Sequence, residues 1–348
     1  MSSKYIHIGF PKNFSTSLQR SYFSAHPELL HLGIGLDNNN LGYRDTTVEK
    51  ALEVYLKSCK DYKYNEVEHG LKQHFNTYFE AGKLQNKKVG ISAEHLSFSF
   101  SYDSISSQIK AQRLFNIFGA DTTIVMVVRN QWELIKSLFR ESIRVGYAGD
   151  FQEYLYLFYK YQDRNYYYDI AYTNAYLTYT DLFGKENVKI LFFENYRNED
   201  GSLVGTTNDS LLLIDDLNSV LGLSELVDFQ HFNKALNQKE LEAKRMLNRT
   251  SHHDLSNHLL ESAEKHRIKQ YLIEDLNVEE PEDKLYEDVA TKRALIEMAS
   301  HAPSNKNLDY SCHSEIKEKM AQFYLEDNSK LETLLHIDLP NQYSKRWE

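Results

Sequence analysis

Residues 4–26 read KYIHIGFPKNFSTSLQRSYFSAH, and this stretch decides the fold class. Tyr5–Phe10 has the length and the apolar character of a β-strand, and a proline follows it, which stops strand pairing. Apolar residues then recur at helical spacing over Leu18–Phe23. The stretch therefore predicts a strand, a short loop that carries Lys12, and a helix.

The loop between the predicted strand and helix has the chemistry of an anion-binding site. The first turn of a helix presents unpaired N–H groups and the positive end of the helix dipole. Lys12 adds a full positive charge, and the hydroxyl side chains add donors. The order Gly-Lys-Ser/Thr, which triphosphate-binding loops use with magnesium, is absent. We therefore predict an anionic group on the following residues: Lys12, Asn13, Phe14, Ser15, Thr16 and Ser17.

A second segment has matching chemistry. Thr122–Val128 is β-branched and apolar on both faces, which is typical of a strand buried in a parallel sheet, and it ends at Arg129. Helical spacing over Trp132–Phe139 places Ser137 two turns into the next helix. A guanidinium binds phosphate oxygens through paired N–H groups, and a serine hydroxyl can complete the contacts. We expect Arg129 and Ser137 to bind a second anionic group.

The fold class follows from four predicted strands that helical patterns separate. They are Tyr5–Phe10, Lys88–Ser92, Thr122–Val128 and Val188–Phe193. This order predicts an α/β fold, a P-loop-like parallel sheet of about four to five strands flanked by helices. The pattern from about residue 233 to 348 predicts a helical C-terminal extension of the same single domain. Ligands of such sheets bind at the carboxyl ends of the strands.

The first loop resembles the 5′-phosphosulfate loop of sulfotransferases, commonly written Pro-Lys-x-Gly-Thr-Thr. Pro11, Lys12 and Thr16 match this motif, and Ser15 replaces its first threonine. Phe14 stands at the usual glycine position, where a positive φ would cost a phenylalanine roughly 1–2 kcal/mol.

The second segment resembles the 3′-phosphate motif of the same superfamily, in which an arginine precedes a serine by eight residues, as Arg129 precedes Ser137. The order of the later segments is similar to that of bacterial carbohydrate-type sulfotransferases. The resemblance implies 3′-phosphoadenosine-5′-phosphosulfate (PAPS) as the sulfuryl donor, without a metal. It implies transfer to a hydroxyl or amine of an acceptor, which we expect to be a carbohydrate or glycan precursor.

Catalytic roles follow from this resemblance. Lys12 would neutralise the charge that develops on the bridging oxygen of the donor. The acceptor needs a base, and Glu94 and His95 directly follow the apolar run that ends at Ser92. A His-Leu pair resembles the catalytic histidine of small-molecule sulfotransferases, whereas other branches use a glutamate. We favour His95 over Glu94, and both remain candidates.

Several alternatives stay open. The loop is also consistent with a P-loop-type phosphotransferase or with a noncatalytic nucleotide-binding protein. The aromatic stretch 151–183 predicts helix packing, with a sugar-stacking groove as the alternative. Asn233–Arg249 is the candidate for a loop that covers the donor. A metal site at His252, His253 and His258 is disfavoured, because no acidic ligand has suitable spacing.

Composition excludes several classes of function. The formal net charge of −10 argues against nucleic acid as a partner, since phosphate neutralisation needs a basic surface. The two cysteines are too few for a disulfide framework. No apolar run is long enough for a membrane span, and the first residues lack a secretory signal pattern. These observations predict a cytoplasmic enzyme.

Overall fold

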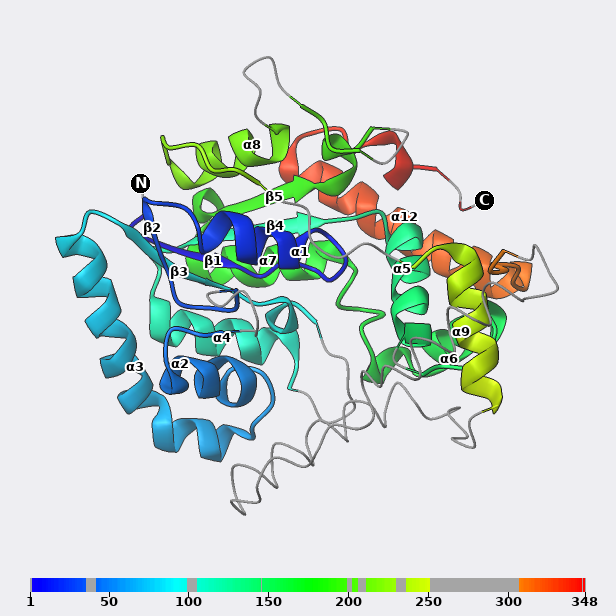
Figure 1. Ribbon diagram of the computed structural model, residues 1–348, viewed down its shortest axis with the longest axis horizontal. Helices are drawn as coiled ribbons and strands as arrows, with labels where there is room; N and C mark the ends of the chain where they lie inside the picture. The colour runs from blue at the N-terminus through cyan, green and yellow to red at the C-terminus, as the bar shows by residue number, and fades with distance from the viewer. Residues whose placement is uncertain are drawn as a thin grey trace.

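A five-stranded parallel sheet runs through the centre of the computed structural model (Figure 1). The strands follow the order β2-β3-β1-β4-β5, and every neighbouring pair is parallel. Their bounds are β1 (Lys4–His7), β2 (Leu29–His31), β3 (Lys88–Ser92), β4 (Thr123–Val128) and β5 (Val188–Phe192). The structure describes residues 2–35, 42–98, 105–144, 146–198, 202–205, 211–229, 236–250, 307–345 and 347.

The sheet confirms the predicted α/β fold class, with two local differences. The predicted strand Tyr5–Phe10 ends earlier, at His7, because the chain then turns toward the Lys12 loop. Only the Ile8 N–H continues the ladder, with a bond of 3.1 Å to the Val125 carbonyl. Strand β2 was not predicted, since three residues are too few for a periodic pattern.

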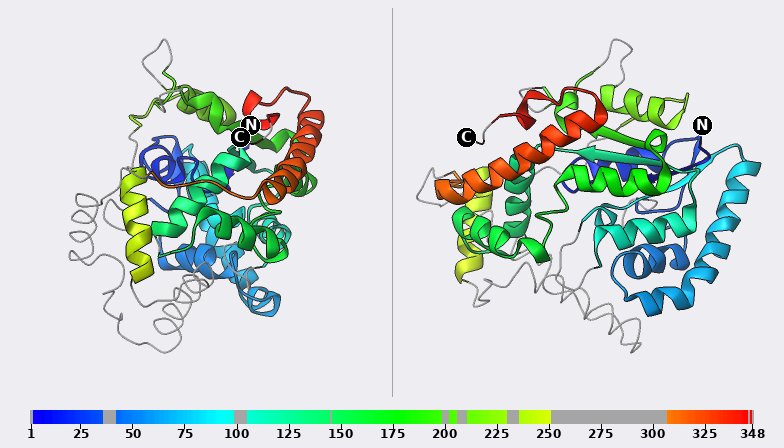
Figure 2. Two further views of the ribbon diagram at one scale, coloured as in Figure 1. Left: turned by 90° about the vertical axis from the view of Figure 1, so that its right-hand side faces the viewer. Right: turned by 180° about the vertical axis from the view of Figure 1, so that it is seen from behind.

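Helices cover both faces of the sheet, as Figures 1 and 2 show. Successive strand residues point to opposite faces. Ile6 belongs to the core cluster that includes side chains of α3, α4 and α7, whereas Tyr5 belongs to the cluster formed with η1 and α8. The bounds of these and the other helical segments are α1 (Ser15–Ser17), η1 (Leu18–Phe23), α2 (Thr46–Lys50), η2 (Ala51–Tyr55), α3 (Asp61–Leu84), η3 (Glu94–Leu96), α4 (Ser107–Phe118), α5 (Gln131–Arg144), α6 (Phe151–Lys160), η4 (Gln162–Arg164), α7 (Tyr172–Phe183), η5 (Lys185–Asn187), η6 (Phe193–Tyr196), α8 (Leu212–Leu221), α9 (Gln238–Thr250), α12 (Ser314–Leu335) and η8 (Asn341–Tyr343).

The C-terminal portion is helical where it is described. Helix α12 packs against α6 and α7, and α9 packs against α5. The prediction of a covering loop over Asn233–Arg249 is wrong for its larger part, because α9 begins at Gln238. Asn237 caps this helix, and its own N–H donates to the Glu240 carboxylate at 2.7 Å, which forms a capping box. The three histidines considered as metal ligands, His252, His253 and His258, lie outside the described residues.

The aromatic stretch 151–183 packs helices together, as predicted. Tyr154, Phe158 and Tyr166 are buried in the core, and the hydroxyl groups of Tyr154 and Tyr166 share a hydrogen bond. Their rings are therefore not available for stacking against a sugar. Within the ranges given above, no helix has both the length and the apolar composition needed to cross a membrane.

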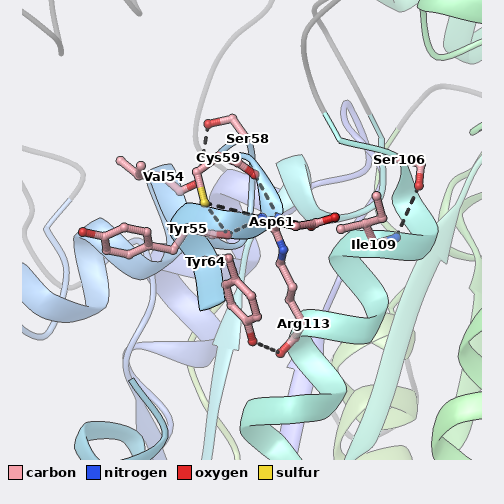
Figure 3. A network of polar contacts seen from close by, with 9 residues as sticks. All are labelled: Val54, Tyr55, Ser58, Cys59, Asp61, Tyr64, Ser106, Ile109 and Arg113. Carbon is pink, nitrogen blue, oxygen red and sulfur yellow. Dashed lines mark hydrogen bonds and ion pairs between the residues drawn. The ribbon is translucent and has the colours of Figure 1, made fainter. Parts of the chain in front are cut away.

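Arg113 of α4 fastens the turn between η2 and α3 (Figure 3). Its guanidinium donates to the carbonyl oxygens of Tyr55 at 2.6 Å and Cys59 at 2.9 Å, and to the Asp61 carboxylate at 2.7 Å. The Arg113 side chain is 2% exposed, whereas Asp61 is 69% exposed. The two buried carbonyl oxygens, rather than the exposed carboxylate, therefore make this arginine necessary.

We expect Arg113→Met to lower the free energy of unfolding by about 3 kcal/mol, since two buried carbonyl oxygens lose their donors. Urea unfolding followed by circular dichroism measures the change. The matched control is Asp61→Asn, for which we expect a loss below about 1 kcal/mol, because the Asp61 side chain is 69% exposed and the asparagine oxygen can still accept from Arg113. An equal loss in both variants would show that the ion pair carries the stability.

Candidate functional site

Four strand ends bring the candidate site together at one edge of the sheet. Because the strands are parallel, their carboxyl ends share this edge. The Lys12 loop follows β1, Glu94 follows β3, Arg129 follows β4, and Glu194 follows β5. The sequence-predicted cations and both candidate bases therefore lie on connections at the same edge.

The Lys12 loop has a left-handed backbone at two residues. Lys12 has φ 65°, and Phe14 has φ 63° and ψ 9°. Phe14 thus adopts the positive φ whose cost was considered above, and it bears a strain of roughly 1–2 kcal/mol. Its ring packs against Phe193 with a centroid separation of 4.6 Å. This aromatic contact offsets the strain and keeps the loop in its conformation.

The predicted loop residues contribute in different ways. Asn13 is buried and its amide donates to the Val127 carbonyl at 2.8 Å, which fastens the loop to β4. Ser15 is buried and donates to Phe10 O at 3.3 Å. Helix α1 begins at Ser15, and its N-cap residue makes no side-chain capping bond. The first turn of α1 and η1 therefore opens directly behind Lys12.

Gly9 is a site residue that the sequence analysis missed. It passes directly over the buried ring of His7, whose Nδ1 lies 2.7 Å from Ser92 Oγ. A Cβ on Gly9 would lie 2.4 Å from His7 Cε1 and 2.7 Å from Nε2. Burial lowers the pKa of His7 to about 3, so the ring is neutral. The close approach of the His7 ring therefore requires a glycine at position 9. No local sequence pattern reveals this requirement.

Arg129 joins the two predicted anion-binding segments. Its Nη1 donates to the Lys12 carbonyl at 3.4 Å, and its guanidinium lies over the Phe193 ring, 4.9 Å from the centroid. The side chain is 11% exposed. Burial lowers the pKa of Arg129; the carboxylates of Glu133 and Glu194 oppose this effect, and the positive charges of Arg140 and Arg197 add to it. A desolvated cation favours an anionic ligand.

One face of α5 lies along both cations. Glu133, Ser137 and Glu141 are spaced four residues apart and therefore share a helix face. Glu133 Oε2 lies 3.8 Å from Arg129 Nη2, and Glu141 Oε2 lies 2.9 Å from Lys12 Nζ. Ser137, between them on this face, is buried. Ser137 is thus placed on the stretch of α5 that spans the two predicted anion positions.

Glu141 was not predicted, although its spacing from Ser137 could have indicated it. Arg144 also donates to this carboxylate, at 2.9 and 3.1 Å. Burial alone would raise the pKa of Glu141, but Lys12 and Arg144 hold it below its usual range. Glu141 is therefore an ionised carboxylate between two cations.

Glu94 faces the Lys12 loop. Its half-buried side chain lies within hydrogen-bonding reach of the Ser15 hydroxyl and interacts with the charge of Lys12. Burial raises the pKa of Glu94 to about 7; Ser15 and Lys12 oppose this effect, and Glu141 adds to it. A carboxylate with this pKa can accept a proton near neutral pH, which is the property of a general base.

His95 has different neighbours from Glu94. Its ring stacks on Phe98 with a centroid separation of 6.3 Å, and its charge interacts with Glu53 of η2. The buried Lys110 Nζ donates to the carbonyl oxygens of His95 at 2.7 Å and Phe98 at 2.8 Å, which fixes this turn. Glu94 interacts with Lys12 and Ser15, and His95 with Phe98 and Glu53.

Glu194 holds the turn that carries Arg129. Its Oε1 accepts from the Asn130 N–H at 2.7 Å, and its Oε2 accepts from the Tyr343 hydroxyl at 2.9 Å. The Asn130 side chain donates to the Gln342 carbonyl at 2.8 Å. Burial raises the pKa of Glu194, while these hydrogen bonds oppose the rise. The segment that contains η8 therefore stabilises the turn that carries Arg129, through hydrogen bonds to Glu194 and Asn130.

Comparisons with known proteins give a likeness in structure and none in sequence. No protein-family model matches the sequence, and no curated protein matches it. Among solved structures, the chain is similar to a sulfotransferase from Alicyclobacillus acidocaldarius, with a TM-score of 0.44 and 15% sequence identity over 98% of each chain. A likeness of this degree establishes neither a family nor an activity. Within the described part of the chain, no group of His, Cys, Asp and Glu side chains is arranged to hold a metal ion.

Proposed function

We propose that this protein is a sulfotransferase that uses PAPS as its donor. The observation that carries the proposal is the contact between the two motif segments, in which Arg129 Nη1 donates to the Lys12 carbonyl at 3.4 Å. One loop supplies an ammonium group at a helix start, and the other supplies a desolvated guanidinium. A nucleotide with anionic groups at both its 5′ and 3′ positions matches this pair of cations.

The residues present fit such a nucleotide. Lys12 and the first turn behind it, with Ser15, Thr16 and Ser17, would hold the 5′ group, together with the backbone of Asn13 and Phe14. Arg129 is buried and its Nη2 lies 3.8 Å from Glu133 Oε2, so an anion at this position would offset its desolvation. Ser137 lies on the adjacent face of α5 and would add a hydroxyl donor.

The chain's own groups supply the remaining chemistry. PAPS, when bound, supplies an activated sulfuryl group on a phosphate leaving group. Lys12 would hold positive charge at the 5′ position, where negative charge develops on the leaving oxygen. Glu94 would take the proton from the acceptor hydroxyl or amine onto its carboxylate. His95 is the second candidate for this role, and its charge interacts with Glu53.

The acceptor that we propose is a carbohydrate or glycan precursor. This part rests on the resemblance of the two loops to sulfotransferase motifs. In the aromatic stretch, Tyr154, Phe158 and Tyr166 are buried, whereas Tyr156, Tyr161 and Tyr168 are exposed. A panel of hydroxyl- and amine-bearing acceptors, assayed with labelled donor, tests it. Transfer to phenols or simple amines without transfer to sugars would contradict the carbohydrate proposal and leave the donor proposal intact.

Calorimetric titration with 3′-phosphoadenosine-5′-phosphate (PAP), compared with ATP plus magnesium, tests the donor. We expect selective binding of PAP, which Lys12→Ala and Arg129→Ala each weaken roughly 10- to 100-fold, because each removes a charge-assisted hydrogen bond. Lys83→Ala is the matched control: it removes a positive charge from the exposed surface of α3 and should leave the affinity unchanged.

Other outcomes point to the alternative functions. Preference for ATP with magnesium would favour a phosphotransferase. An affinity that does not respond to Arg129→Ala would mean that the two segments do not share one nucleotide, which would contradict the proposal. Tight PAP binding without transfer to any acceptor would favour a noncatalytic nucleotide-binding protein.

A further inference from the structure

We propose that Glu141 makes the donor site select a monoanionic sulfuryl group over a dianionic phosphoryl group at the Lys12 position. This inference rests on the proposed function, since it takes Lys12 as the residue beside the transferred group. It assigns a specificity role to a carboxylate on α5 that belongs to neither motif.

The contacts of Glu141 define the charge of this position. Its Oε2 lies 2.9 Å from Lys12 Nζ and 2.9 Å from Arg144 Nη1. The Lys12 and Glu141 side chains are each 33% exposed, so the ion pair is in contact with solvent. Two cations and one carboxylate leave a net charge of about one positive unit. A single negative charge matches this balance, whereas a double negative charge exceeds it.

Glu94 acts in the same direction from the other side of the loop. Its carboxylate interacts with the charges of both Lys12 and Glu141. When Glu94 is ionised, as a base must be, a second carboxylate faces the transferred group. At short range, one additional negative charge beside two carboxylates is repelled strongly enough to change a dissociation constant by about tenfold or more.

The test compares two ligands that differ only at this position. They are PAPS and 3′-phosphoadenosine-5′-diphosphate, in which a phosphoryl group replaces the sulfuryl group and carries up to two negative charges near neutral pH. Calorimetry gives both dissociation constants for the wild type and for Glu141→Gln. We expect the wild type to bind PAPS at least tenfold more tightly, and Glu141→Gln to reduce this ratio by about fivefold to tenfold.

Two further variants sharpen the result. Glu133→Gln removes the same charge from the same helix face, but near Arg129, which meets the 3′-phosphate of both ligands. Glu133→Gln should change the affinities for both ligands by the same factor. The ratio of the two dissociation constants should therefore stay within about twofold of the wild-type ratio. Arg144→Gln should raise the ratio, because Glu141 loses one of its two cations. This opposite shift keeps the test decisive if Glu141→Gln folds poorly.

The outcomes separate this inference from the proposed function. A ratio that is the same in the wild type, Glu141→Gln and Arg144→Gln, with both ligands bound, would overturn the role of Glu141 and leave the donor site in place. Failure of the folded wild type to bind either nucleotide would overturn the proposed function and this inference with it.

Discussion

Replacing Glu94 with glutamine is expected to reduce sulfuryl transfer by roughly 10²- to 10⁴-fold, the usual contribution of a general base, while PAP still binds. The amide keeps the size of the side chain but cannot take a proton. In the wild type, kcat/KM should rise with pH and level off above about pH 7, because the base must be ionised and the pKa of Glu94 is about 7. Lys12 and Glu141 are the charged groups that face this carboxylate.

His95→Gln is the matched control for the base. We expect less than about tenfold loss of transfer in this variant, since Glu94 is the residue that interacts with Lys12 and Ser15, whereas the His95 ring stacks on Phe98. The reverse result, with Glu94→Gln active and His95→Gln inactive, would assign the base to His95. Full activity in both variants would remove this strand end from the mechanism.

Glu94→Gln should also stabilise the protein at high pH, relative to the wild type. The pKa of Glu94 is raised above its usual value of 4.5, so the folded state holds this proton more tightly than the unfolded state. Its contribution is complete below about pH 4.5 and is lost as the pH rises through 7. Relative to wild type, Glu94→Gln should therefore gain on the order of 2 kcal/mol between pH 5 and pH 8, measured by urea unfolding. A gain that does not depend on pH would contradict the raised pKa.

Gly9→Ala is expected to lower the free energy of unfolding by about 2–3 kcal/mol and to weaken PAP binding at least tenfold. The new Cβ would lie 2.4 Å from His7 Cε1, and the His7 ring is held by Ser92 and by packing against Phe23. The loop must therefore move away from β1, which displaces Lys12. Urea unfolding and calorimetric titration measure the two effects.

The double variant His7→Ala/Gly9→Ala tests the cause of this loss. His7→Ala opens a cavity directly beneath residue 9, so the added methyl group should then be accommodated. We expect the double variant to be more stable than the sum of the single changes predicts, by at least about 1 kcal/mol. Strict additivity would mean that the clash with His7 is not the reason for the glycine.

Much of this architecture could be predicted from local patterns. The strand Lys88–Ser92 was predicted with its observed bounds, because an apolar run bounded by polar residues defines a buried strand. The placement of Lys12 and Arg129 followed from the rule that parallel strands end at one edge. Both are consequences of sequence-local features combined with one topological rule.

The remaining site features arise from contacts between distant segments, which no local pattern contains. Gly9 is required by the ring of His7 and by the hydrogen bond of that ring to Ser92 on β3. The pKa of Glu94 is raised by burial and partly lowered again by Ser15 and Lys12, which are about 80 residues away in the chain. Strand β2 was missed because it is very short. The segment of helix α9 was interpreted as a covering loop because that interpretation came from the resemblance.

The hydrogen bonds that stabilise the Arg129 turn set the order in which the protein can be completed during synthesis. The Asn130 N–H donates a hydrogen bond to Glu194, and Glu194 accepts one from Tyr343. The hydrogen bonds of this turn are therefore complete only after Tyr343, the last of the three residues, has been synthesised. The Lys12 loop, by contrast, is among the first segments to emerge. A nascent chain thus carries an incomplete candidate site until η8 docks, and contacts of such long sequence separation form slowly. The Arg129 side of the candidate site is therefore completed later than the Lys12 loop.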